Sequence, residues 1–334
     1  MQARVEHARM DAPDTSRDAA DASLAPHVID TLLLVTPGVI WGSSFLWIKV
    51  ALGSDTAAGF SPLLLVTFRL AFGLLGLLVL LAMRGQQLPR DGRTLRACAV
   101  VGLFNTALPF VLITWGETHI PSGVASILNG TVPLFTLVIA HFALHDEPLT
   151  ASRVVGLVSG FGGVVVLVGR GLGSGAGSLA GQGAVVAAAI SYAGAATYTR
   201  RVLRGMSPLL QATTTMLFAI AMVGSATVAL EWPLSLPARP MAWVAAAWLG
   251  LLGSCTAYLL YFSLLNAWGA TRASLVTYVF PVVGLLLGIV ILDEPVDWRL
   301  AAGTALIVAG IVIVNAHAVL AALPGGGAGE RRRA

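Results

Sequence analysis

Arg69 is the residue whose type and position most directly suggest chemistry. It lies about seven residues into a long apolar stretch that begins at Pro62, roughly 10 Å from the nearer end if the stretch is helical. A cation at that depth in a bilayer costs a few kcal/mol, so it must face protein or a wet cavity. Two interpretations stay open: a cation that attracts an anionic or carboxylate group, and a structural arginine that snorkels outward or bonds helix-end carbonyls.

Other polar and aromatic side chains also lie well inside apolar stretches. Trp41 and Tyr192 have small neighbours and lie away from the expected interfaces, where membrane aromatics usually collect. A place beside a cavity and simple packing between helices are both open for them. Together with Arg69, the candidate substrate contacts are Trp41, Ser44, Asn105, Asn129, Tyr192, Tyr258 and Thr277.

Three prolines interrupt apolar stretches and are predicted to act as hinges: Pro109, Pro133 and Pro281. A proline inside a helix removes a backbone donor and clashes with a carbonyl one turn earlier. Lipid cannot satisfy the freed carbonyl, so each kink is expected to face other helices, polar side chains or water. Asn129 and Thr277 stand one turn before their prolines and either meet that need or contact substrate.

Acidic residues are absent from the depth of every apolar stretch, which argues against a carboxylate relay at the bilayer centre. Glu117, His119 and His141 are the remaining candidates for proton coupling. No catalytic constellation, metal-ligand cluster or phosphate-binding glycine loop is found, so neither an enzyme nor a cofactor is expected. Glu147 and Glu294 each precede a proline, and we expect them to cap the helices that follow.

The composition is that of a membrane protein. The 334 residues are 57% hydrophobic and 11% charged, with a mean hydropathy of +0.84. A soluble domain carries about 25% charged residues, so this chain could not cover itself with a wetted surface. The net charge of +4 comes from arginines in short loops, which does not indicate nucleic acid binding. Cys98 and Cys255 are isolated and are expected to be small core residues.

Ten apolar segments follow a polar beginning, and each is about long enough to cross 30 Å of hydrocarbon as a helix. None alternates with the period of a barrel strand. Loop arginines gather on one side, which predicts cytoplasmic N- and C-termini. The predicted segments are 32–50, 62–83, 95–115, 123–144, 153–169, 180–199, 208–230, 241–265, 270–292 and 300–320.

The two halves of the chain repeat each other. Ala125-Ser126 recurs as Ala273-Ser274 at an offset of 148, and an Asp-Glu-Pro triplet and a pair of glycines recur at an offset of 147. Five helices per repeat is an odd number, so the second repeat is expected to enter the membrane inverted. The predicted architecture is an all-α polytopic membrane protein with ten transmembrane helices in two inverted repeats, 31–170 and 171–322, between a disordered cytoplasmic tail (1–30) and a flexible basic tail (323–334).

These features together resemble the EamA-type transporters of the drug/metabolite transporter superfamily. The resemblance rests on Trp41-Gly42-Ser43-Ser44-Phe45 with Lys49 closing the first stretch, on Arg69, and on the two proline-containing segments that are each followed by Glu-Pro. It implies a bacterial inner-membrane protein that exports or exchanges small metabolites, such as amino acids or amphipathic compounds, by alternating access. A homodimer is a further expectation.

The main rival is a translocator of lipids or other hydrophobic compounds, or a membrane partner protein without transport of its own. A lipid path would be a polar groove open sideways to the bilayer, whereas a solute cavity should be sealed from lipid. The positions of Arg69, Asn105 and Asn129 therefore discriminate between the two classes.

Overall fold

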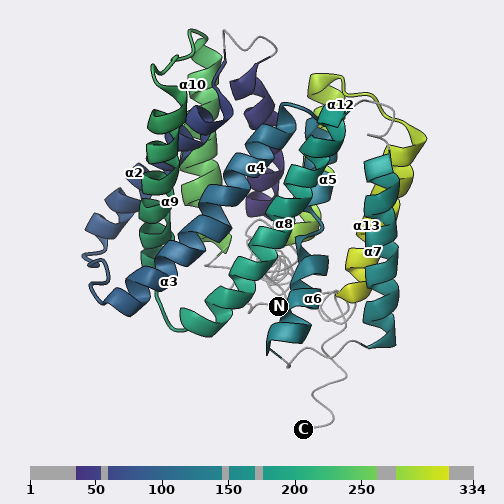
Figure 1. Cartoon of the computed structure of the whole chain (residues 1–334), viewed down its shortest axis with the longest axis horizontal. Helices are drawn as coiled ribbons and strands as arrows, with labels where there is room; N and C mark the ends of the chain where they lie inside the picture. The colour runs from purple at the N-terminus through teal and green to yellow at the C-terminus, as the bar shows by residue number, and fades with distance from the viewer. Residues whose placement is uncertain (1–34, 54–58, 145–149, 170–175, 262–275, 316–334) are drawn as a thin grey trace, which may run out of the picture.

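The computed structural model describes residues 35–53, 59–144, 150–169, 176–261 and 276–315. Within these ranges the chain is helical and has no strand, as the sequence predicted. The helices form a single bundle (Figure 1). Besides the helix Val35–Leu52, its elements are α2 Pro62–Met83, α3 Gly92–Gly102, η2 Leu103–Ala107, α4 Leu108–Glu117, α5 Ser122–Asn129, α6 Val132–Leu144, α7 Ala151–Gly169, α8 Ala176–Val202, α9 Pro208–Glu231, α10 Pro240–Ala247, η4 Trp248–Thr256, α12 Val276–Leu292 and α13 Trp298–Val314.

Eight helices in the described ranges are long and apolar enough to cross a bilayer, and α12 and α13 are shorter apolar helices where the ninth and tenth segments were predicted. The count of ten spans, the inverted repeat and the cytoplasmic termini therefore stay predictions. The eight candidate spans are Val35–Leu52, Pro62–Met83, Gly92–Glu117, Ser122–Ala143, Ala151–Gly169, Gly177–Val202, Pro208–Glu231 and Pro240–Tyr261.

Local sequence signals set several helix starts. Pro62 and Pro208 each occupy the first position of a helix, where a missing N–H costs nothing. Ser61 caps α2 by accepting a hydrogen bond from the Leu64 amide. Asp91 caps α3 in the same way, and the hydrogen bond that it accepts from the Thr94 backbone lowers the pKa of its exposed carboxyl group.

The fourth predicted segment is broken rather than bent. The sequence predicted one helix kinked at Pro133, but α5 ends at Asn129 and α6 begins at Val132, with Gly130 and Thr131 between them. Pro133 thus lies in the first turn of a new helix, where its ring has no preceding helical carbonyl to clash with. Pro281 differs, because it stays inside α12.

Two spans contain π-helical segments. In the third span η2 separates α3 from α4, and in the eighth span η4 follows α10 directly. Pro109 is the second residue of α4, immediately after η2. Such wide turns inside α-helices occur frequently at functional sites, because they shift side chains out of regular register. Here they carry Asn105 and Ser254.

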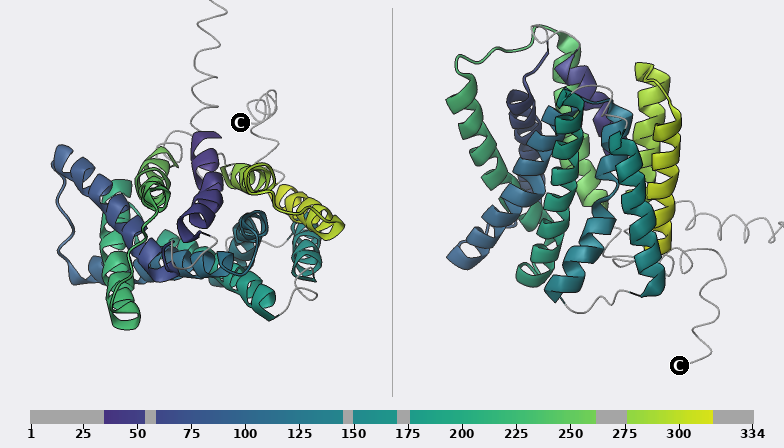
Figure 2. Two further views of the ribbon diagram at one scale, coloured as in Figure 1. Left: turned by 90° about the horizontal axis from the view of Figure 1, so that it is seen from above. Right: turned by 45° about the vertical axis from the view of Figure 1, so that its right-hand side comes forward.

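Helices α7 and α13 pack through a stripe of glycines on each helix, because small residues let two helices approach closely. A Cβ atom on Gly156 would lie 2.8 Å from the Gly310 carbonyl oxygen, and one on Gly163 would lie 2.7 Å from that of Gly303. The order of contacts reverses along the two helices, so they run antiparallel, side by side at one edge of the bundle (Figure 2). The stripe therefore serves packing within one chain.

The residues of α7 and α13 that contact each other occupy equivalent positions in the two sequence repeats. Gly303 and Gly310 are the counterparts of Gly156 and Gly163 at the offset of 147. Gly156 contacts Gly310, the counterpart of Gly163, and Gly163 contacts Gly303, the counterpart of Gly156. Ser159 Oγ donates a hydrogen bond of 3.1 Å to the carbonyl of Leu306, its own counterpart 147 residues later. The two helices therefore contact each other through corresponding positions of the sequence repeat.

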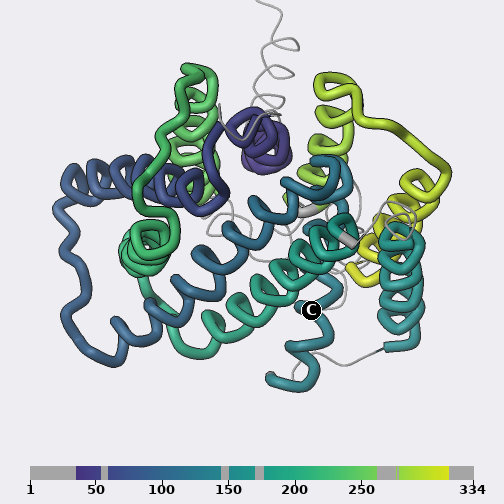
Figure 3. Tube along the Cα trace, turned by 45° about the horizontal axis from the view of Figure 1, so that its top comes forward, coloured from purple at the N-terminus to yellow at the C-terminus, as the bar shows by residue number. Residues whose placement is uncertain are grey.

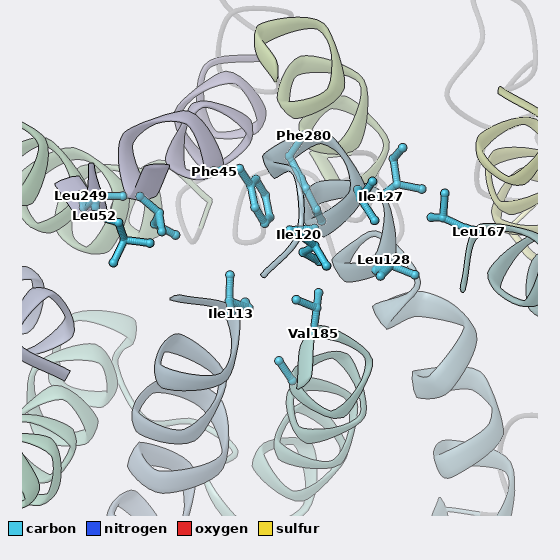
Figure 4. Packing of buried hydrophobic residues seen from close by; sticks show 14 of the residues in the cluster. Phe45, Leu52, Ile113, Ile120, Ile127, Leu128, Leu167, Val185, Leu249 and Phe280 are labelled. Atoms are coloured by element: carbon cyan, nitrogen blue, oxygen red, sulfur yellow. The ribbon is translucent and has the colours of Figure 1, made fainter. Parts of the chain in front are cut away.

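The main apolar core joins both halves of the chain. The helix Val35–Leu52 lies between η4 on one side and α12 on the other (Figure 3). Its Phe45 stacks on Phe280 of α12 with ring centroids 6.5 Å apart. Ile113 of α4 and Val185 of α8 close the core beneath them (Figure 4). The core thus holds the first helix in the middle of the bundle, beside the polar residues described next.

Candidate functional site

Arg69 of α2 points into the protein and not toward the membrane interface. Its side chain is 7% exposed, its Nε donates a hydrogen bond of 3.1 Å to Ser254 Oγ, and its Cζ lies 3.8 Å from the centre of the Phe110 ring. Neither terminal nitrogen has a hydrogen-bond partner or an ion-pair partner among the described residues. A buried guanidinium with two free donor groups is suited to bind a carboxylate in a bidentate manner.

Helix 35–52 brings two predicted residues to the same place. Trp41 Nε1 donates a hydrogen bond of 3.0 Å to the carbonyl of Gly253. A Cβ atom on Gly253 would lie 3.3 Å from Ser44 Oγ and 3.8 Å from a terminal nitrogen of Arg69. Gly253, which lies within η4, therefore leaves room for the side chains of both Ser44 and Arg69.

Tyrosines complete this group. The Trp41 ring contacts Tyr258 and Tyr261 with centroids 5.7 and 5.4 Å apart. Tyr192 of α8 and Tyr258 are both close enough to Arg69 to interact with its charge, and Tyr258 shares a hydrogen bond with the Asn105 side chain. Five predicted contacts, Trp41, Ser44, Asn105, Tyr192 and Tyr258, thus gather around Arg69.

A small cavity adjoins the tyrosines and has a volume of about 30 Å³, room for a water molecule. It lies between the third, seventh and eighth spans. Its lining mixes polar and apolar side chains: Val101, Asn105, Thr106, Gln211, Ala212, Thr215, Met216 and Tyr258. A metabolite would need the helices around this cavity to move apart.

The predicted contacts near the helix breaks are placed differently. Asn129, the last residue of α5, has a buried Oδ1 that finds no hydrogen-bond partner within the described ranges, so this oxygen is available to a ligand. Thr277 lies in α12 one turn before Pro281, and its side chain is outside the described residues. Gly130 packs on the Pro281 ring, where an added Cβ would lie 2.7 Å away. The break between α5 and α6 therefore packs against the predicted hinge Pro281 of α12.

Glu117 differs from the other two candidates for proton coupling. The third span extends two residues beyond its predicted end, and Glu117 at its end is fully buried. His119 is exposed and is hydrogen-bonded to Thr118. His141 lies in the last turn of α6, which is roughly 28 Å from Ser122 along the fourth span at helical rise. Only Glu117 is both buried and close to the other charged residues.

Glu294 caps a different helix from the one predicted. The sequence predicted that it would cap the following helix, but α13 is capped by Asp297, which accepts a hydrogen bond of 2.8 Å from the Leu300 amide. The Glu294 carboxylate instead accepts hydrogen bonds from the amides of Ser122 and Gly123, at 2.5 and 2.8 Å. It thus holds the N-terminus of α5. Glu147 is outside the described residues.

Several contributors escaped the sequence analysis. Phe110 and Ser254 hold Arg69, and neither residue type suggests that role in isolation. Tyr261 could have been found, because it follows Tyr258 at helical spacing and shares its face. Lys49 donates a hydrogen bond to the main-chain carbonyl of Glu117 and not to lipid headgroups. These contacts join segments that are far apart in sequence, so local patterns do not reveal them.

The described surface also has an apolar groove of about 470 Å³ between the third span, α6 and α8. Almost all of its lining residues are apolar or small: Val100, Val101, Phe104, Leu108, Ile139, Ala187, Ile190, Ser191, Gly194, Ala195 and Tyr198. Arg69, Asn105 and Asn129 do not line it. The polar candidates therefore lie inside the bundle, and the outer groove is suited to acyl chains.

Among the described residues, no three His, Cys, Asp or Glu side chains come close enough together to hold a metal ion. The arrangement around Arg69 can instead bind a small organic anion: a cation for the acidic group, hydroxyl and amide groups for polar substituents, and aromatic rings for an apolar body.

The family to which the chain belongs follows from its two halves. Residues 29–169 and, separately, residues 179–316 match the EamA-like transporter family. Because these matches cover most of the sequence, the chain belongs to that family, and it is a membrane transport protein. The same family pattern found twice agrees with the duplication seen in the sequence.

The chain is similar to several proteins named as transporters. It is 28% identical over 291 residues to an uncharacterised transporter of Archaeoglobus fulgidus, covering 85% of this chain and 97% of that protein. It is 30% identical over 257 residues to the uncharacterised inner membrane transporter YedA of Escherichia coli K12, covering 75% and 78%. A probable terminal-alkyne amino-acid exporter of Streptantibioticus cattleyicolor is 29% identical over 290 residues, covering 84% and 92%.

The fold is also found in a solved structure described only as the crystal structure of a protein. That structure has a TM-score of 0.63 and 21% identity, and the alignment covers 89% of this chain and 99% of the other. With the family match and the apolar helices, these similarities make the protein a multi-pass protein of the inner membrane.

Proposed function

We propose that the protein is a secondary carrier that exports or exchanges small amphipathic metabolites with an acidic group, amino acids among them, by alternating access. The observation that carries this proposal is Arg69: its buried guanidinium has two nitrogens without a partner in the described part of the chain, and it lies among aromatic rings from several helices. An acidic group would neutralise the buried charge, while Trp41 and the tyrosines would pack against an apolar body. The named function of the amino-acid exporter among the relatives supports this substrate class.

The packing of α7 on α13 supports the alternating-access part of the proposal. Reciprocal contacts between Gly156, Gly163 and their counterparts are what an inverted repeat with an axis in the membrane plane requires. Carriers of this type bind substrate near the midplane, between the halves. The hydrogen bond between Arg69 and Ser254, which joins different halves of the chain, supports a site between the halves.

Transport of lipids is the alternative that the geometry favours less. A lipid path would need polar side chains along a groove that opens to the bilayer, but the groove near Phe104 and Ile190 is apolar. Arg69 is enclosed by protein. A headgroup would have to cross the packed interior to reach it.

The test is uptake of a panel of radiolabelled amino acids and aromatic acids by proteoliposomes that contain the purified protein. We expect flux for at least one acidic or zwitterionic compound. Arg69→Ala should lower that flux at least about tenfold, because a bidentate charge pair contributes more than 1.4 kcal/mol. The folded yield should stay unchanged.

Arg239→Ala is the matched control, since Arg239 is exposed at the start of α10, and its flux should equal that of the unmodified protein. A loss of folded yield in Arg69→Ala with normal flux per folded molecule would assign Arg69 a structural role. Scrambling of fluorescent phospholipid without flux of any panel compound would favour the lipid alternative.

A further inference from the structure

Glu117 is a buried acid that the substrate site does not use. Its side chain is completely inaccessible at the end of α4, and neither carboxylate oxygen has a hydrogen-bond partner among the described residues. A carboxylate removed from water without hydrogen bonds costs several kcal/mol unless nearby charges compensate it. A group in this situation is neutralised most readily by taking up a proton.

Charges from three other segments face Glu117. Lys49 and Arg69 attract its anionic form, and Glu294 repels it. Lys49 nevertheless directs its ammonium group to the main-chain carbonyl of Glu117 and not to the carboxylate. His119, two residues further along, is exposed and hydrogen-bonded to Thr118. Groups of both signs therefore act on the buried Glu117 carboxyl group.

A second unpartnered polar atom lies at the same end of the bundle. Ser122 is fully buried, and its Oγ has no hydrogen-bond partner among the described residues. A Cβ on Gly288 would lie 3.0 Å from that Oγ and 2.5 Å from Glu294 Oε2, so the two oxygens share one small space. Buried polar groups without partners are rare in folded proteins, and a bound water, an ion or a functional role is the usual explanation.

We propose that Glu117 binds a proton, in a site whose other members are Lys49, Ser122 and Glu294. Binding and release of this proton are linked to the opening and closing of this end of the bundle. The link rests on the proposed carrier function, whereas the binding of a proton by Glu117 does not. Docking of Glu294 on α5 brings a second carboxylate near Glu117. Protonation of Glu117 therefore stabilises the docked arrangement, and by reciprocity docking favours protonation.

The occupant is a proton and not a metal cation. The Lys49 ammonium already contacts Glu117, and Arg69 adds a second positive charge on another side. Alkali and alkaline-earth cations need several converging oxygen ligands, whereas the Glu294 oxygens are already engaged by two backbone amides. A proton needs only one carboxylate oxygen.

Substrate binding is coupled to this site through Arg69. An anion bound at Arg69 would cancel one of the two positive charges that stabilise ionised Glu117. Binding of an anionic substrate and binding of a proton should therefore favour each other. The sign of the coupling follows from charge alone and requires no contact between the two ligands.

The test is an infrared titration of the ligand-free full-length protein in lipid nanodiscs, in sodium-free buffer. We expect a carboxylic-acid carbonyl band that grows on acidification and is lost in Glu117→Gln. Glu231→Gln is the matched control and should keep the band, because Glu231 is another span-terminal acid, partnered by the Ser61 hydroxyl. Monodisperse elution of each variant verifies folding.

Lys49→Gln provides a second readout if Glu117→Gln does not fold. Removal of the ammonium takes away the closest stabilising charge, so the midpoint of the band should move to higher pH by about one unit or more. With sodium added at constant pH the band should not change. Loss of the band on addition of sodium would identify a cation site and overturn the proposal.

Two further outcomes would overturn it: a band that stays constant across the accessible pH range, and a titrating band that survives in Glu117→Gln. The measurement uses no substrate, so it is independent of transport. A titrating Glu117 in a protein without measurable flux would leave the proton site standing and count only against the carrier function.

Discussion

At the residue scale, the decisive feature is that the described groups in direct contact with Arg69 are neutral. Ser254 accepts one hydrogen bond from Nε and Phe110 supports the face of the guanidinium. Neither neutralises the charge, so the protein keeps a buried cation whose compensation must come from elsewhere. This separates Arg69 from arginines that stabilise a fold through ion pairs.

The geometry predicts that a positive charge at position 69 is not sufficient for transport. Arg69→Lys keeps the positive charge but loses the planar donor fork and the stacking on Phe110. We expect flux in proteoliposomes to fall about tenfold or more, with little change in thermal stability. Ser254→Ala, which removes one neutral hydrogen bond from the same guanidinium, should have a smaller effect of about 1 kcal/mol or less. Full activity of Arg69→Lys would contradict the bidentate model of binding.

At the element scale, the Glu294 cap joins the turn between α12 and α13 to the N-terminus of α5. Glu294→Ala removes the acceptor for the Ser122 and Gly123 amides. We expect a loss of about 0.5–2 kcal/mol of stability, the usual cost of a lost N-terminal cap. Hydrogen exchange of the first turn of α5 should accelerate.

Asp293→Asn is the control for the Glu294 cap. Asp293 adopts a positive φ of 52°, a conformation that asparagine also tolerates, and it lies next to Glu294. In the Asp293→Asn variant, hydrogen exchange in the first turn of α5 should match that of the unmodified protein. Equal acceleration in both variants would show that the turn as a whole, and not the carboxylate of Glu294, protects α5.

The α7–α13 pair gives a second prediction at this scale. Gly163→Ala would place a methyl group 2.7 Å from the Gly303 carbonyl oxygen, whereas Gly162→Ala would meet nothing within 4 Å. Overpacking against backbone costs about 1–3 kcal/mol, so the first variant should unfold several degrees earlier in a thermal melt in detergent. Similar melting of the two variants would mean that the helices separate easily.

At the scale of the whole molecule, the inverted repeat makes a prediction about topology. Thr150 and Val296 precede α7 and α13 in corresponding turns and are exposed. Single cysteines there, in a background without Cys98 and Cys255, should react with a membrane-impermeant maleimide from opposite sides. Val296→Cys should label in intact cells, and Thr150→Cys only after permeabilisation. Labelling of both from the same side would exclude the inverted arrangement.

The sequence alone was sufficient for the class of protein and for much of the fold. Hydropathy sets membrane spans because a bilayer forces every backbone group to bond within its own helix. Proline spacing predicted the interruption of the fourth segment near Pro133, since proline acts through its own backbone, but the helix at Pro281 continues. Arg69 could be singled out because a charge among apolar residues is visible without a structure.

Only the tertiary structure decided which side chains meet. Ser254 and Phe110 around Arg69, Lys49 against Glu117, and Glu294 on α5 are contacts between segments distant in the chain. A hydrogen bond across helices depends on rotation and register, which hydropathy does not encode. The cap predicted for α13 was wrong for this reason: an acid beside a helix start satisfies whichever N-terminus the packing brings nearest, and here that is the N-terminus of α5.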